Sequence, residues 1–323
     1  MTLFLLDLPR KTVNLEELCF SLDPSRKRLD SRVHRAYRNE IKQFYEEYAK
    51  NARPKHDPEN NPILALERFR IKDGRRSFGL RCAEFKDYYA LKKLLYQHCD
   101  DDPLLMEQFV VLGMIAVLET SDNHLVLGHR CGEHLPNRYL PPAGFQECPG
   151  VITPGYFREK CGEEFREEVG IDFDGNISYI GLTGDTRDSF LDVSVFYGKT
   201  PLNCAEVQKA WELLGSKTEH KHLIYIPSTP SDLTTFLRGR YSGVVNPFMD
   251  IVFERGLCIH GPEEIKGRKY QQIENGVGAL AAYLSLKVQP DDLRARLSRL
   301  PSLNVIEDVV EKDLANSDSV FLR

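Results

Sequence analysis

Apolar segments in the middle of the chain predict a central sheet. The uncharged apolar run at residues 109–118 is suited to a strand that is buried on both faces. Turn-forming residues at 121–123 and a second apolar segment at 124–130 predict that the chain returns beside this strand as a hairpin. Further strands are expected at residues 176–182, 191–198 and 223–226.

Apolar residues at helical spacing predict helices around this sheet. Residues 31–50 form an amphipathic pattern, with aliphatic and tyrosine side chains recurring among Arg, Lys and Glu. Thr153 followed by Pro154 provides an N-cap and a first helical position, and Gly170 provides the C-terminal stop of the same helix. Other helices are expected at residues 84–98, 231–237 and 276–286, and in the tail from residue 290.

The order of these elements predicts the domain organisation. A polar stretch with three prolines at residues 51–62 is typical of a linker or long loop. A hairpin at 66–72 and 77–82, followed by a helix, completes a small α+β unit before the acidic segment 100–103. We therefore expect an α/β (α+β) protein with an N-terminal flanking domain at 1–107, a main domain at 108–290 and a C-terminal helical tail at 291–323.

Composition limits the kinds of binding partner and the cellular compartment that are expected. A net charge of −5 over 323 residues gives no electrostatic case for binding DNA or an anionic membrane. The eight cysteines are scattered without a Cys-x-x-Cys pair, so neither a disulfide framework nor a zinc site is expected and reduced thiols fit better. The opening residues are too short for a signal-peptide core, and 109–118 is too short to span a bilayer. A cytoplasmic location is expected.

The helix that ends at Gly170 carries the candidate chemistry. At about 100° per residue, Glu164, Glu167 and Glu168 fall within one arc beside an apolar stripe. Like charges at this spacing oppose helix formation, and a divalent cation would remove the conflict. Mg²⁺ is the natural ion because it prefers hard oxygen ligands. The alternative reading of such a run is a solvated surface.

These residues carry a resemblance to a known family. Residues 163–171 read Glu-Glu-Phe-Arg-Glu-Glu-Val-Gly-Ile, which resembles the second half of the Nudix hydrolase motif G-x5-E-x7-R-E-U-x-E-E-x-G-U, where U is apolar. The Leu-Pro-Pro-Ala-Gly loop ending at Gly144 is similar to the loop that opens this motif. Glu163 stands where the family has Arg. The spacing from Gly144 to Glu164 is 20 positions against 15 in the motif, so the loop carries a five-residue insertion and Gly155 occupies the place of the motif's first Glu.

The resemblance implies a fold and a metal site. It implies a Nudix α/β/α sandwich with a mixed sheet, in which Glu164, Glu167 and Glu168 hold Mg²⁺, or Mn²⁺ in its place. Ala143 or Gly144 would contribute a backbone carbonyl. In the family the motif's Arg braces a ligand carboxylate, and here Arg166 is expected to pair with Glu163 instead. Glu167 or Glu219 would be the catalytic base; an exposed loop pair is the alternative reading of Glu219 and His220.

The resemblance also implies a substrate class, a small-molecule nucleotide. The segments 67–71 and 79–89 look similar to a region of the UDP-glucose pyrophosphohydrolase branch, so hydrolysis of UDP-glucose to UMP and glucose 1-phosphate is the leading expectation. The alternatives are an ADP-ribose or dinucleoside-polyphosphate hydrolase, and a Nudix-fold module that binds nucleotide without turnover. The candidate substrate contacts, for which loop salt bridges are the alternative reading, are Arg138, Arg187 and Asp188, together with Gly144.

Overall fold

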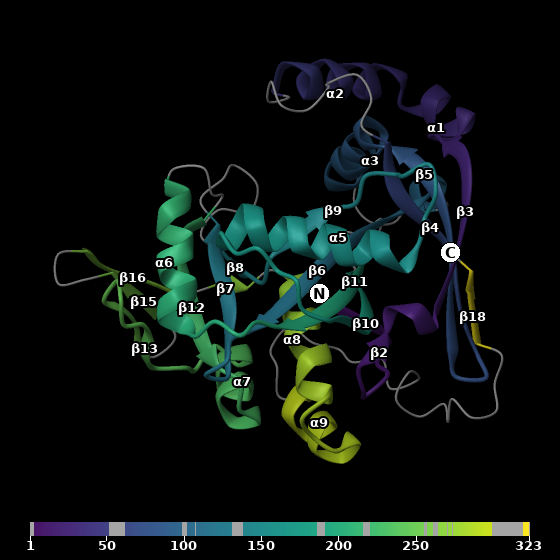
Figure 1. Cartoon of the computed structure of the whole chain (residues 1–323). Coiled ribbons are helices and arrows are strands. Elements are labelled where there is room, and N and C mark those ends of the chain that lie inside the picture. Colours follow the sequence, from purple (N-terminus) through teal and green to yellow (C-terminus); the bar gives the residue numbers. More distant parts are fainter. Residues whose placement is uncertain are drawn as a thin grey trace.

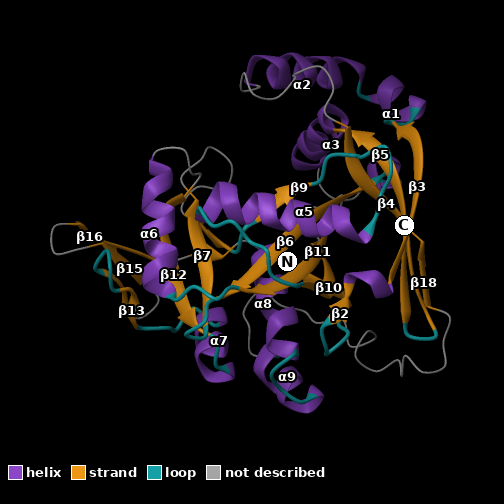
Figure 2. Cartoon of the chain, in the orientation of Figure 1, coloured by secondary structure: helices purple, strands orange, loops and turns teal. Residues whose placement is uncertain are grey.

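The computed structural model describes residues 3–51, 62–98, 102–106, 108–130, 138–185, 191–215, 220–254, 257–260, 264–269, 271–272, 274–298 and 319–322. Within these ranges, strands form one large mixed sheet of fourteen members and a second sheet of four. Helices lie around the large sheet, and the small sheet projects beyond α6 (Cys204–Leu214) (Figures 1 and 2). The predicted α/β class is confirmed.

Strand β6 (Val110–Glu119) lies at the centre of the large sheet. It pairs in parallel with β11 (Leu191–Lys199) along one edge, and antiparallel with β4 (Pro62–Lys72), β9 (Ala143–Phe145) and β7 (His124–Arg130) along the other. All ten of its residues are buried. Alternate side chains of β6 enter two different hydrophobic cores, as expected for a strand covered on both faces.

Each face of the sheet is covered by its own helices. The core on one face is shared with α7 (Pro230–Leu237), α8 (Glu274–Ser285) and α9 (Pro290–Leu297). The core on the opposite face is shared with α5 (Pro154–Glu164), its continuation η2 (Phe165–Val169) and α6. A third core lies beneath the N-terminal helices, which are α1 (Ser31–Ala36), α2 (Arg38–Asn51), α3 (Phe85–His98) and α4 (Pro103–Met106).

The N-terminal region is built into the same sheet. Strand β1 (Leu3–Asp7) pairs with β10 (Ile177–Asp185), and β4 pairs with β6. Buried Asp7 accepts hydrogen bonds from the guanidinium of Arg76 and from the hydroxyl of Tyr179, which lie on strands from opposite sides of residue 107. The sheet is therefore continuous across the expected boundary, and the division at residues 107 and 290 stays a prediction.

Several predicted elements differ in length. The expected hairpin consists of β4 and β5 (Arg75–Glu84), joined at Asp73 and Gly74, whose φ values of +51° and +75° suit a tight hairpin turn. The helix expected at 31–50 is two helices, interrupted at Tyr37 where φ reaches −120°. In the described part of the tail, α9 is the helix, and β18 (Ser319–Leu322) instead pairs with β4 as a strand. The linker residues 52–61 lie outside the described ranges.

Some elements were not predicted. These are α4 and α6, η1 (Leu15–Glu17), and the strands β1, β2 (Val13–Asn14), β3 (Leu18–Lys27), β8 (Arg138–Leu140), β9, β17 (Gln271–Gln272) and β18. The small sheet was not predicted either and consists of β13 (Gly243–Asn246), β14 (Ile251–Glu254), β15 (Leu257–His260) and β16 (Glu264–Lys269). Strand β12 (His220–Pro227) contains the strand expected at 223–226. Among the described residues, no helix is both long and apolar enough to cross a membrane.

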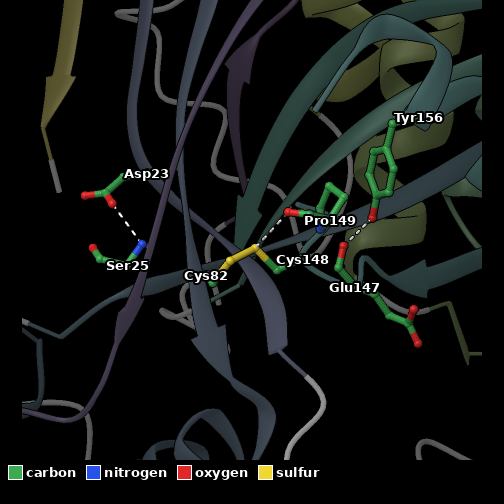
Figure 3. The surroundings of a disulfide bond; sticks show 7 residues. All are labelled: Asp23, Ser25, Cys82, Glu147, Cys148, Pro149 and Tyr156. Carbon is green, nitrogen blue, oxygen red and sulfur yellow. Dashed lines mark hydrogen bonds between the residues drawn. A yellow bond between two sulfur atoms is a disulfide. The ribbon is translucent and has the colours of Figure 1, made fainter. Parts of the chain in front are cut away.

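A disulfide corrects the expectation that the thiols are free. Cys82 of β5 is bonded to Cys148, with 5.4 Å between the Cα atoms (Figure 3). The backbone brings them together, because Leu64 donates to the carbonyl of Gln146 and Cys148 donates to that of Pro62. The 66 positions between the two cysteines hide this pairing in the sequence. The bond joins β5 to the loop between β9 and α5, where Tyr156 also donates to the carbonyl of Glu147.

Candidate active site

The acidic helix begins and ends where the sequence predicts, but its last turn is wider than an α-helix. The side chain of Thr153 accepts a hydrogen bond from the amide of Tyr156, and Gly170 ends the helix in the left-handed region at φ +82°. A Cβ at Gly170 would lie 2.6 Å from the carbonyl oxygen of Ala210, so α6 leaves no room for a side chain there. The turn Phe165–Val169 is a π-helix, a rare feature that often marks functional sites.

The three glutamates lie in different environments. Glu164 is half-buried, Glu167 is exposed and Glu168 is 6% exposed. Glu168 therefore lies in the interior, while Glu167 faces solvent.

Glu164 lies directly over Gly144. Strand β9 places Gly144 opposite Met114 of β6, beneath α5. A Cβ at Gly144 would come within 2.0 Å of Glu164 Oε1 and 2.8 Å of its carboxyl carbon. The carboxylate thus occupies the space that any other residue at 144 would fill with its side chain.

Glu168 reaches the neighbouring residue of the same strand. Its Oε2 accepts a hydrogen bond from the amide of Ala143 at 3.2 Å. The same oxygen lies 3.2 Å from Nε2 of His220, whose side chain is also buried. Two carboxylates from one helix therefore meet β9 at adjacent residues, Ala143 and Gly144.

The residue in the place of the family's Arg turns away from this site. Glu163 pairs with Lys160 at 2.6 Å, and Arg166 pairs with Asp172 at 2.8 Å on the surface. The expected pair between Glu163 and Arg166 is therefore wrong. Lys160 lies about one helical turn before Glu163, and Asp172, which follows Gly170, lies within reach of Arg166.

Other predicted site residues are only partly described. Arg138 lies in β8, without a described side chain. Arg187, Asp188 and Glu219 lie outside the described ranges, and their roles stay predictions. His220 was not predicted to act in the site, although Gly128 inside the neighbouring strand was an available signal for a close approach.

The residues present suit a hard divalent cation. The site offers carboxylate and backbone carbonyl oxygens, the ligand types that Mg²⁺ prefers, and Gly144 forms a cradle that a Cβ would fill. In the described ranges, three other possible ligand atoms lie within 4.8 Å of one another. They belong to Asp122, His124 and Cys204. The oxygen of Asp122 is engaged there by the hydroxyl of Thr120 and the amide of Cys204, and burial raises the pKa of the Cys204 thiol to about 12. Hydrogen bonds at the start of α6 thus account for this second group.

Comparison with known proteins gives no family model and no curated protein that matches the chain. Many solved structures resemble part of it, and three of them are described here. A MutT/nudix family protein from Enterococcus faecalis shares 12% identity, over 68% of this chain and 74% of that one, with a TM-score of 0.32. The NUDIX domain of NrtR from Shewanella oneidensis, complexed with ADP ribose, shares 14% over 42% and 81%, with a TM-score of 0.28. An ADP compounds hydrolase shares 11% over 59% and 79%, with a TM-score of 0.31. The fold assignment rests on the sheet and helices described above.

Proposed function

We propose that the protein is a metal-dependent Nudix pyrophosphohydrolase acting on a nucleoside diphosphate linked to another group. The observation that supports this best is the meeting of Glu164 and Glu168 with adjacent residues of β9. It joins the two halves of the family-like motif, the loop ending at Gly144 and the acidic helix, although twenty positions separate them in the chain. UDP-glucose, cleaved to UMP and glucose 1-phosphate, is the leading substrate, and ADP-ribose is the first alternative.

The proposed chemistry is electrostatic. Glu164, Glu167 and Glu168, with a carbonyl of β9, would hold Mg²⁺ or Mn²⁺. When bound, the ion neutralises charge on the phosphate oxygens and lowers the pKa of a coordinated water. The buried Glu168 is held by Ala143 and His220, and the exposed Glu167 would be the base that accepts a proton from the attacking water. Glu219 is the alternative base, and Arg138, Arg187 and Asp188 are proposed to orient the substrate.

The test is hydrolysis by the purified protein with Mg²⁺, read out as nucleotide release from UDP-sugars, ADP-ribose and dinucleoside polyphosphates. We expect Glu164→Gln and Glu168→Gln to lower kcat/KM by at least about 100-fold, because each removes a charge that acts on the transition state. Glu163→Gln is the matched control, since this side chain pairs with Lys160 outside the site. Glutamine variants that retain the parent's rate would contradict the mechanism.

One observation favours a second function. Glu163 replaces the motif's Arg, and Gly155 stands in place of its first Glu, which suits a module that binds nucleotide without cleaving it. Nucleotide binding measured by calorimetry, without turnover of any substrate in the same panel, would favour the module.

A further inference from the structure

Glu168 is a buried carboxylate with two identified partners. Its side chain is 7% exposed and that of His220 is 1% exposed. Burying a carboxylate is costly unless it is paired and hydrogen-bonded. The amide of Ala143 and the ring of His220 supply bonds to the same oxygen, Oε2, at 3.2 Å each. These two contacts set the direction in which Oε2 points.

The sheet is shaped to admit the His220 ring. A Cβ at Gly128 would lie 2.2 Å from Cδ2 of His220, so the ring rests on the bare backbone of β7. The pairing of β12 with β7 shifts register between His220 and Leu223. Such irregularities redirect a side chain relative to a regular strand. His220 is paired with Arg130, and at this irregularity its ring lies over Gly128 and reaches Glu168.

The direction of the hydrogen bond follows from chemistry. An ionised carboxylate only accepts hydrogen bonds, so Nε2 of His220 donates to an ionised Glu168. A carboxylate has about four acceptor positions, of which the bonds on Oε2 use two. Both bonds are to Oε2, so the contact constrains the carboxylate through this oxygen.

We propose that His220 is a positioning residue that holds Glu168 in the orientation needed to bind the metal ion. This inference rests on the proposed function. The family-like motif assigns such bracing to an Arg, but Glu163 stands at that position and is bonded to Lys160. A residue 57 positions further along the chain supplies the brace from across the sheet. Residues that orient a ligand in this way typically change metal affinity by about 10–100-fold when they are replaced.

The experiment measures Mn²⁺ binding to the full-length protein by calorimetry, without substrate. We expect His220→Leu to weaken binding by about 10–100-fold. His220→Gln, which keeps an N–H donor at a similar reach, should stay within about threefold of the parent. The matched control is His222→Leu, a buried histidine of the same strand that stacks on His129. Its Mn²⁺ affinity should equal that of the parent.

Each outcome bears on the proposal. Rescue by Gln supports it, because loss of packing alone would not depend on a donor. Equal affinities in the parent and the Leu variant, or equal losses in Leu and Gln, would overturn it. If thermal unfolding shows that the Leu variant is not folded, His220→Asn replaces it, since this amide is shorter by one methylene and should not reach Glu168. If the parent neither binds Mn²⁺ nor hydrolyses any substrate, the proposed function fails and the inference with it; an active parent with unaffected variants refutes the inference alone.

Discussion

Replacing Gly144 by alanine is expected to lower activity without lowering the stability of the fold. The backbone at Gly144 is not in the left-handed region, so alanine can adopt its conformation. The three heavy atoms nearest to the added methyl group all belong to the carboxylate at the end of the flexible Glu164 side chain. A Gly-to-Ala change at a compatible position stabilises a protein by about 0.4–1 kcal/mol through the unfolded state. We therefore expect Tm to stay the same or rise slightly.

Activity should respond quite differently. The methyl carbon would lie 2.0 Å from Glu164 Oε1, whereas ordinary contact begins near 3.4 Å. The oxygen has to withdraw by about 1.4 Å, more than the ~1 Å misplacement that can cost about 100-fold in rate. We expect kcat/KM to fall by about 100-fold, which corresponds to about 2.7 kcal/mol of transition-state stabilisation.

The assay compares nucleotide release as Mg²⁺ is varied, together with thermal unfolding. Gly150→Ala is the matched control, because it lies in the loop that follows β9 and a Cβ there meets nothing within 4 Å. An alanine variant at 144 with parental activity and metal dependence would refute the role of Glu164. Equal losses in both variants would show that the loop, rather than the contact with Glu164, matters.

Three further predictions concern stability. Cys82→Ser should lower the free energy of unfolding by about 2–4 kcal/mol, because the disulfide closes a loop across 66 positions; urea unfolding measures this. Asp7→Asn should cost about 3–5 kcal/mol in the same assay, because it leaves the buried guanidinium of Arg76 without a counter-charge. Burial raises the pKa of Glu119, but hydrogen bonds from Tyr197 and Tyr283 outweigh it and hold the pKa below its usual value. Its contribution is therefore complete above 4.5, the ordinary pKa of a glutamate, and is lost as pH falls through the lower folded-state pKa, so Glu119→Gln should flatten the acid limb of the stability profile.

Each of these has its own control. Reductant should destabilise the parent but leave the Cys82→Ser variant unchanged, and Cys19→Ser, at an exposed free thiol, should have no effect. The double change Asp7→Leu with Arg76→Met should recover much of the loss, since apolar replacement of a whole buried pair is often tolerated. A parent and a Glu119→Gln variant with parallel stability curves below pH 4.5 would contradict the role of Glu119.

Elements with local signals were predictable. The apolar run of β6 and the cap and stop of the acidic helix depend on residues close in sequence, and the structure has them within a few positions. Helix α6 also had such a signal. Asn203 and Glu206 form a capping box, a spacing that the sequence displays. The sequence therefore contains enough information to predict α6.

Features that depend on distant parts of the chain were not predictable. Residues 3–7 form strand β1 because they pair with the edge of β10. Cys148 meets Cys82 because its loop pairs with β4. The π-helical turn departs from the periodicity that the prediction assumed, and the burial of Glu168 beside His220 depends on β12, which is distant in the chain. The resemblance suggested which residues gather near Gly144, but not the histidine that approaches them from β12.

The continuity of the large sheet limits how the chain can be divided. A fragment beginning at residue 108 would lose β4, which pairs with Val110 and Val111 of β6, and β1, which pairs with β10. The edges of β6 and β10 would then present unpaired amides and carbonyls to solvent, and Tyr179 would lose its buried partner Asp7. Unpaired strand edges are templates for association with other chains. Such a fragment is therefore expected to aggregate, because in the whole chain β1 and β4 cover the edges of β10 and β6.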